Sequence, residues 1–301
     1  SVRRLFNPLF LIGSFVALPS WASTQIINQL MTGSRWYSDS ITYGFPLTAD
    51  TIMGPSGETQ TFKPLSADQQ KAVVLAMTTW DDLIMSQLVE STQNQDIAFG
   101  LSTTATSYAH SYFPPNGSIW LNATDSGLSF PQVGKYGFET YVHEIGHSLG
   151  LDHMGSYNGA GDNKPSCYED STVYTVMSYF GPEHRSGLGD VAWADWTGAN
   201  GVLYSPQTPM LSDIQTIQFI YGADLTTRTE DSVYGFNANV SGQMASILDF
   251  AKNANPILTI YDAGGTDTLD FSGWNTPSNI NLEAGQFSSC NEMTNNVAIA
   301  Y

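Results

Sequence analysis

The chain has 301 residues and a mass of 32.7 kDa, which suffices for one large domain or two smaller ones with a substantial core. Acidic residues number 28 against 10 basic ones, giving a formal net charge of −18. With 42% hydrophobic and 12% aromatic residues, the composition excludes a disordered acidic tail, and the negative charge argues against nucleic acid and anionic membranes as partners. Bound cations are compatible with this charge, and solubility alone is the alternative explanation of it.

Residues 1–22 have the features of an export signal. Arg3 and Arg4 form a basic start, an apolar stretch continues to Leu18, and small residues precede a cleavage point after Ala22. We therefore expect an exported protein that is extracellular, or periplasmic in transit. A buried N-terminal helix is the alternative interpretation of this segment.

A long helix and two short strands are the first elements predicted after this segment. Ser66 and Gln69 have the spacing of a capping box, and apolar residues then recur at helical spacing, so a helix is expected over residues 67 to about 88. The runs 96–101 and 118–122 read as short strands.

Two further helices and an irregular region are predicted in the next part of the chain. One helix is expected to end at Gly150, and another to follow Pro209. Residues 155–208 are rich in Gly, Asn, Ser and Pro, which is typical of a functional loop region. Beyond Gly222 the pattern changes to short strands broken by Gly and Asn, which indicates a domain boundary.

The segment from His143 to His153 contains three of the five histidines and predicts a metal site. His143 and His147 are four residues apart, so they lie on one face of a helix. Gly150 permits a reversal that brings His153 back as a third ligand. Three imidazoles in this arrangement suit Zn²⁺ and leave one position open for water. Glu144 is the expected general base, which takes a proton from that water and passes it to the leaving amine.

The remaining histidines and the two cysteines carry weaker signals. His110 and His184 are expected to be structural or at the surface, with His184 as an additional candidate for the cleft. Cys167 and Cys290 form either a disulfide, which an exported protein permits, or two unrelated buried thiols.

The histidine motif resembles that of the metzincin metalloproteases, and its surroundings resemble the serralysin branch of that family. The sequence at 175–179, Thr-Val-Met-Ser-Tyr, matches the methionine turn of these enzymes. The resemblance implies that Met177 lies beneath the metal, and that Tyr179 ligates zinc and then stabilises the developing oxyanion. Further serralysin-like stretches extend the match from about Trp36 to Tyr301.

The resemblance also implies a fold and a calcium site. We expect an α+β protein with a metzincin catalytic domain of a twisted mixed sheet and long helices over residues 23–222, followed by the start of a parallel calcium-binding β-roll over 223–301. One degenerate glycine-rich repeat covers residues 264–269. By this resemblance the Ca²⁺ ligands would be Arg228, Glu230 and Ser232 through backbone oxygens, facing Asp262, Gly264 and Asp267. Glu230 replaces a family glycine, which puts its backbone angle in question, and a plain tight turn is the alternative.

The implied function is a secreted zinc endopeptidase that acts on polypeptides as a monomer, with a protein inhibitor as a candidate second partner. A substrate would bind as an added strand near residues 118–122. A Cys167–Cys290 disulfide would tie the active-site loop to the C-terminal domain. The alternatives are a secreted binding module that keeps the fold without catalysis, and another kind of metal hydrolase.

Overall fold

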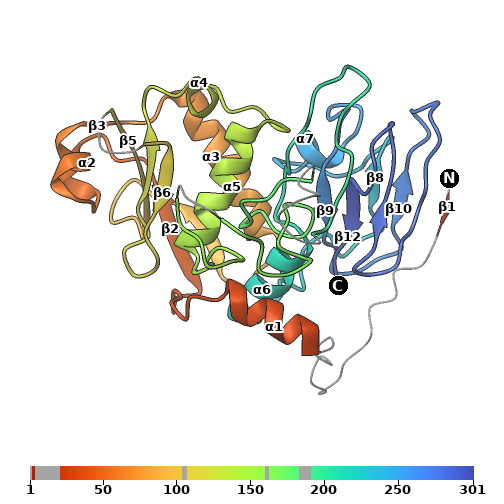
Figure 1. Ribbon diagram of the computed structural model, residues 1–301, viewed down its shortest axis with the longest axis horizontal. Coiled ribbons are helices and arrows are strands. Elements are labelled where there is room, and N and C mark those ends of the chain that lie inside the picture. The colour runs from red at the N-terminus through yellow and green to blue at the C-terminus, as the bar shows by residue number, and fades with distance from the viewer. Residues whose placement is uncertain (1, 4–20, 104–106, 160–162, 183–190) are drawn as a thin grey trace.

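The computed structural model describes residues 2–3, 21–103, 107–159, 163–182 and 191–301 (Figure 1). Most of the expected export signal at residues 1–22 lies outside this part of the chain, and so does His184, so both predictions stay untested. None of the helices in the described ranges has the length and apolar character needed to cross a bilayer.

A mixed sheet forms the N-terminal half of the molecule. Its six strands are β2 (Ser40–Gly44), β3 (Phe62–Lys63), β4 (Gln87–Glu90), β5 (Ile97–Ser102), β6 (Ala109–Ser111) and β7 (Ile119–Asn122). Their order is β4-β2-β5-β7-β6, with β3 paired to β5. Strand β6 runs antiparallel to β7 and forms one edge, whereas β7 lies between β5 and β6. The expectation of a substrate-binding edge at residues 118–122 is therefore wrong, because that strand is already paired on both sides.

The helices flank this sheet and precede the C-terminal strands. They are α1 (Trp21–Leu30), the short 3-10 helix η1 (Ala49–Thr51), α2 (Ser56–Gln60), α3 (Ala67–Asp81), α4 (Ser126–Ser129), α5 (Tyr136–Ser148) and α6 (Leu211–Tyr221). The capping box at the start of α3 is confirmed, because Ser66 and Gln69 bond each other's backbone N–H groups at 3.2 and 2.9 Å. The helices predicted to end at Gly150 and to follow Pro209 are confirmed as well.

Helix α3 is shorter than the apolar spacing predicts. It ends at Asp81 instead of continuing to about residue 88. The Asp81 carboxylate accepts a hydrogen bond from the Leu88 N–H at 2.6 Å, which fixes the turn into β4. Ile84 forms an isolated bridge with Ala223, far along the chain. Leu83 and Ile84 are thus buried by this turn and bridge and not by a further helical turn.

Helix α5 crosses the middle of the molecule and packs against α3 (Figure 1). The indole N–H of Trp80 on α3 donates to the Val142 carbonyl on α5 at 3.1 Å. Trp80, Phe138 and Ile145 are fully buried between the helices and the sheet. Burial of each such side chain contributes about 1.5–3 kcal/mol to the free energy of folding, so α5 is firmly held in place.

The C-terminal strands form two small sheets at the other end of the molecule (Figure 1). Their elements are β8 (Val233–Gly235), α7 (Ala245–Leu248), β9 (Leu258–Ile260), β10 (Thr268–Asp270), β11 (Phe287–Ser288) and β12 (Val297–Ile299), with β1 (Val2–Arg3) added beside β10. Strands β8 and β10 pair in parallel, and so do β9 and β12. The expected fold class, a metzincin-like mixed sheet with helices followed by the start of a parallel roll, is confirmed.

The two cysteines are free thiols. Cys290 is buried in the C-terminal core, where its sulfur accepts a hydrogen bond from the Asn296 side chain at 3.3 Å. Cys167 is half-buried on the loop beside Ser166. Of the two alternatives, the structure thus has two separate thiols and not the disulfide, and the loop is held by other contacts.

Candidate metal centre

A glycine turn at the end of α5 brings the third histidine back to the first two. Gly150 has φ +108°, and a Cβ there would overlap the Ser34 carbonyl oxygen, so no other residue fits without backbone movement. The Leu151 N–H closes the helix by donating to the Gly146 carbonyl at 3.0 Å. The Asp152 N–H then bonds the Leu30 carbonyl at 2.7 Å and directs the chain back toward the helix.

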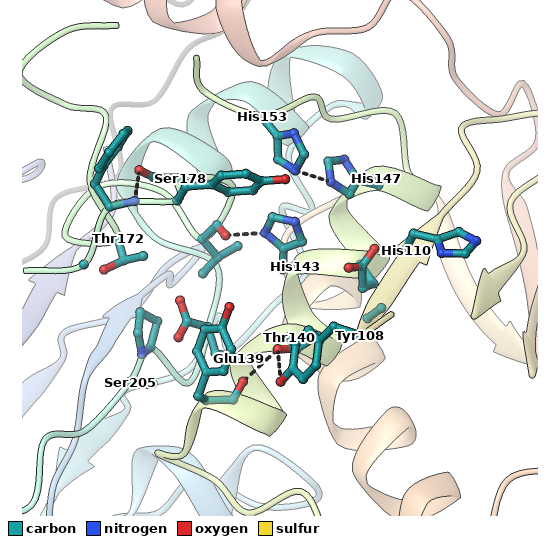
Figure 2. A pocket seen from close by; sticks show the side chains of 18 of the residues that line it. Tyr108, His110, Glu139, Thr140, His143, His147, His153, Thr172, Ser178 and Ser205 are labelled. Atoms are coloured by element: carbon teal, nitrogen blue, oxygen red, sulfur yellow. Dashed lines mark hydrogen bonds between the residues drawn. The ribbon is translucent and has the colours of Figure 1, made fainter. Parts of the chain in front are cut away.

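The imidazoles of His143, His147 and His153 converge on one point (Figure 2). Their ring centroids lie 4.6–5.3 Å apart, and Nε2 of His147 is 3.1 Å from Nε2 of His153. Two nitrogens that each lie about 2.05 Å from one tetrahedral ion are about 3.3 Å apart. The three histidines therefore fit a zinc ion.

A backbone carbonyl orients each of these imidazoles through its Nδ1. The pairs are His143 with Val176 at 2.6 Å, His147 with Leu151 at 2.7 Å and His153 with Tyr157 at 3.0 Å. A carbonyl only accepts hydrogen bonds, so each Nδ1 holds the proton and each Nε2 lone pair is free for a metal. Burial, helped by nearby His143, lowers the pKa of His153 to about 4 and the pKa of His147 well below its usual value. Both rings are therefore neutral near pH 7, as metal ligands must be.

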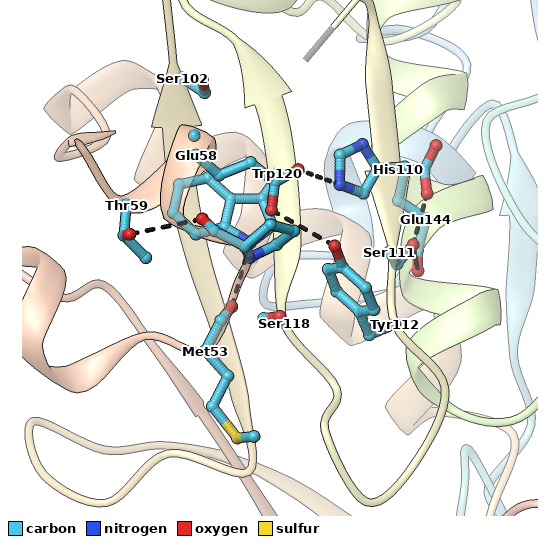
Figure 3. Close-up of polar contacts among 12 residues, drawn as sticks. Met53, Glu58, Thr59, Ser102, His110, Ser111, Tyr112, Ser118, Trp120 and Glu144 are labelled. Carbon is cyan, nitrogen blue, oxygen red and sulfur yellow. Dashed lines mark hydrogen bonds and ion pairs between the residues drawn. The ribbon is translucent and has the colours of Figure 1, made fainter. Parts of the chain in front are cut away.

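Glu144 lies beside this cluster, buried at the wall of the same cleft. Its carboxylate is hydrogen-bonded by the hydroxyl of Ser111 on β6 (Figure 3). Burial raises the pKa of Glu144, while nearby His143 and the Ser111 hydrogen bond oppose the rise. A carboxylate with a raised pKa next to three converging imidazoles is suited to accept a proton.

Met177 and Tyr179, the two residues singled out in the methionine turn, both lie next to the histidine cluster. Met177 is fully buried, and its sulfur lies 2.8 Å from where a Cβ on Gly146 would stand, so it packs under the helical turn that carries the histidines. The Tyr179 ring centroid lies 4.6 Å from that of His153. Its hydroxyl accepts a hydrogen bond from the Gly159 N–H at 2.9 Å, and Tyr179 lines the same cleft as the histidines.

A buried carboxylate that the sequence analysis missed holds the methionine turn in place. Asp213 on α6 accepts hydrogen bonds from the Thr175 hydroxyl at 2.6 Å and the Val176 N–H at 2.8 Å. Burial raises its pKa to about 6. Because the Val176 carbonyl in turn binds His143, Asp213 supports the histidine through one intervening residue. An acidic residue in the first turn of the helix predicted after Pro209 is the only sequence signal for this role.

The metal centre opens onto a cleft of about 1240 Å³. Edge strand β6 and α5 form part of its lining, and the loop segment 178–182 forms another. His110, which was expected to be structural or at the surface, also lines the cleft and forms an ion pair with buried Glu58 (Figure 3). The described parts of residues 155–208 contain no helix or extended strand, which agrees with the predicted loop region.

The residues predicted to bind calcium lie on two facing loops. The Ser232 N–H donates to Asp267 Oδ1 at 2.9 Å, and a Cβ on Gly265 would lie 2.5 Å from the Glu230 carbonyl oxygen. Asp267 Oδ2 is buried without a hydrogen-bond partner among the described residues. Arg228, with φ +50°, takes the left-handed conformation, and Glu230 does not. An orphaned carboxylate oxygen between loops fits a hard cation.

Two family models match this chain. The model described as metallo-peptidase family M12B, reprolysin-like, matches residues 21–195, which include the histidine cluster. The model described as peptidase M10 serralysin C terminal matches residues 223–301, which include the two small C-terminal sheets. The matched regions correspond to the two halves of the fold.

Curated relatives agree with these models. The chain is 37% identical to "Serralysin C" of Dickeya chrysanthemi, over 94% of this chain and 57% of that protein. It is 36% identical to "Serralysin" of Photorhabdus sp. (strain Az29), over 79% of this chain and 50% of that protein, and 33% identical to "Metalloprotease AprA" of Pseudomonas entomophila (strain L48), over 94% and 60%. The chain thus spans half to three fifths of the length of these relatives. With its histidine cluster and methionine turn, it belongs to the serralysin-type metzincin metallopeptidases.

Proposed function

We propose that this chain is a zinc endopeptidase that hydrolyses peptide bonds in extended polypeptides. The observation that carries the proposal is the convergence of three imidazole Nε2 atoms beside a buried glutamate at the wall of a long cleft. Membership in a metallopeptidase family implies zinc, and His143, His147 and His153 would hold it. When bound, zinc lowers the pKa of water toward 7 and polarises a carbonyl.

The chain's own residues then move the proton and stabilise charge. Glu144 takes a proton from the attacking water and delivers it to the nitrogen of the leaving amine. We propose that Tyr179 would also help to hold zinc and that its hydroxyl would donate a hydrogen bond to the developing oxyanion, which it can do while its oxygen still accepts from the Gly159 N–H. Met177 would pack under the histidines and support them. Gly150 would allow the turn that brings His153 back to the other two ligands.

Edge strand β6 is the proposed site for the substrate backbone. The Tyr108 carbonyl and the Tyr112 N–H bond β7, so by strand alternation the backbone groups of Ala109 and Ser111 face the open edge. This edge lines the cleft next to Glu144. An extended peptide added here would have its backbone fixed by hydrogen bonds beside the proton acceptor.

Cleavage of casein or a peptide library by the purified chain, with and without a zinc chelator, tests this function. We expect cleavage that the chelator abolishes and added zinc restores. Zinc-loaded, folded protein that cuts nothing would instead support a binding module that kept the fold. The same assay on Tyr179→Phe tests the oxyanion role, and an unchanged kcat would remove Tyr179 from the mechanism.

We also propose that the facing loops 228–232 and 262–267 bind Ca²⁺. The ligands would be the backbone oxygens of Arg228, Glu230, Ser232 and Gly264 with the carboxylates of Asp262 and Asp267. The orphaned Oδ2 of Asp267 supports the proposal. Arg228 also contacts Asp82 and donates to the Tyr261 carbonyl at 2.6 Å, so these loops lie against the end of α3.

Calcium is expected to stabilise the folded protein. At a concentration 100 times its Kd, binding to the native state alone adds about 2.7 kcal/mol to the free energy of unfolding. The midpoint of thermal unfolding should therefore rise with added Ca²⁺ in the wild type. It should not rise in Asp267→Asn, which keeps the shape of the side chain without its charge. An equal rise in both proteins would exclude Asp267 as a ligand.

Export and domain organisation complete the proposal. We propose an export signal at 1–22, a catalytic domain at 23–222 and a roll-like domain at 223–301. The strands before α6 form one six-stranded sheet and those after it belong to two separate three-stranded sheets, which supports the second boundary. N-terminal sequencing of secreted protein checks cleavage after Ala22, and limited proteolysis checks the boundary near residue 222.

A further inference from the structure

We propose that Ser111 is a positioning residue that holds the Glu144 carboxylate in the orientation needed for proton transfer. This inference rests on the proposed peptidase function and adds a residue of the edge strand to it. Ser111 acts through Glu144 and does not itself touch the reacting atoms.

One hydroxyl bridges two parts of the same glutamate. Ser111 Oγ contacts Oε2 of Glu144, and it also lies 2.9 Å from the Glu144 backbone carbonyl oxygen (Figure 3). The hydroxyl has a single proton to share between these two oxygens, so it links the carboxylate to its own backbone. That link restricts the side-chain torsions of Glu144, leaving Oε1 as the carboxylate oxygen not bound by Ser111.

The strand that carries Ser111 is itself anchored from its other face. Side chains alternate along a strand, so His110 and Tyr112 point away from α5. Both contact Glu58, which is only 3% exposed: His110 through an ion pair and Tyr112 through its hydroxyl at 3.4 Å. This buried carboxylate holds β6 against the segment that includes α2, and the Ser111 hydroxyl is thereby kept against Glu144.

Ser111 also connects Glu144, the proposed general base, to the substrate peptide that would pair with β6. Its backbone N–H and carbonyl face the open edge of β6, where the substrate would pair, while its side chain faces Glu144. One residue would thus set the distance between the scissile bond and the proton acceptor. Loss of its hydroxyl should then disturb the chemical step more than substrate binding.

The test compares three serine variants. Ser111→Ala is expected to lower kcat about 10- to 100-fold with KM within about threefold of the wild-type value, because misplacing a catalytic group costs rate more than binding. Ser111→Thr keeps the hydroxyl and should restore most of kcat. Ser148→Ala is the matched control: Ser148 Oγ also bonds the Glu144 carbonyl, at 3.3 Å, but is not bonded to the carboxylate. It should keep the wild-type kcat.

Zinc content and a crystal structure of each variant supply readouts that do not depend on activity. We expect full zinc loading in all variants, one Glu144 rotamer in the wild type and Ser111→Thr, and several rotamers in Ser111→Ala. A single rotamer and an unchanged kcat in Ser111→Ala would overturn the proposal. An inactive, zinc-loaded wild type would refute the peptidase function, and the Glu144 rotamers would still decide whether Ser111 orients this side chain.

Discussion

Replacing Glu144 by alanine is expected to lower kcat by about 10²- to 10⁴-fold while zinc stays bound. A positioned general base increases the rate of such reactions by about 10²- to 10⁴-fold. Glu144 is suited to this role because it lies beside the three histidines in the cleft, where the Ser111 hydroxyl bonds its carboxylate. The histidines keep their Nδ1 partners on Val176, Leu151 and Tyr157 in this variant, so their Nε2 atoms remain available. Casein cleavage and zinc content should be measured on the same sample.

Two further variants separate proton transfer from other effects. Glu144→Gln keeps the shape of the side chain and can still bond Ser111, but it cannot take a proton, so it should be as inactive as the alanine variant. Glu90→Ala removes an exposed glutamate on β4, at the opposite edge of the sheet, and should leave activity unchanged. Undiminished cleavage by Glu144→Gln would mean that another group accepts the proton.

Local sequence patterns were sufficient to predict the centre of the site. The spacing of His143 and His147 fixes them on one helical face whatever the rest of the fold does, and Gly150 marks the end of that helix. The capping box at Ser66 is local in the same sense, because both of its partners lie within four residues. Features of this kind depend on neighbours along the chain, so the sequence alone reveals them.

The residues that the sequence analysis missed act through contacts between distant segments. Ser111 meets Glu144 across 33 residues, and Asp213 meets Val176 across 37. Strand β6 has only three residues and no clear apolar alternation, so it could not be predicted, and the edge was assigned to β7 instead. The prediction that α3 reaches residue 88 is wrong for a similar reason. Ile84 pairs with Ala223, far along the chain, although its sequence spacing is that of a helix.

The glycine turn after α5 should be nearly intolerant of substitution. We expect Gly150→Ala to lower the free energy of unfolding by about 3–5 kcal/mol, because it combines a strained backbone at φ +108° with overlap of the Ser34 carbonyl oxygen. Gly33→Ala is the matched control in the neighbouring loop. Gly33 has φ +83° but nothing within 4 Å of its Cβ position, so only the strain of about 1–2 kcal/mol should appear.

The same substitution should weaken zinc binding, because the turn orients two of the ligands. Leu151, the next residue, supplies the carbonyl that holds His147, and the chain must reverse here for His153 to return. Loss of such orienting partners costs about 10- to 100-fold in metal affinity. Zinc titration against a competing chelator, below the unfolding temperature of Gly150→Ala, measures this effect. A wild-type zinc affinity in a variant with lowered thermal stability would show that the histidines hold their geometry without the turn, and that Gly150 serves folding alone.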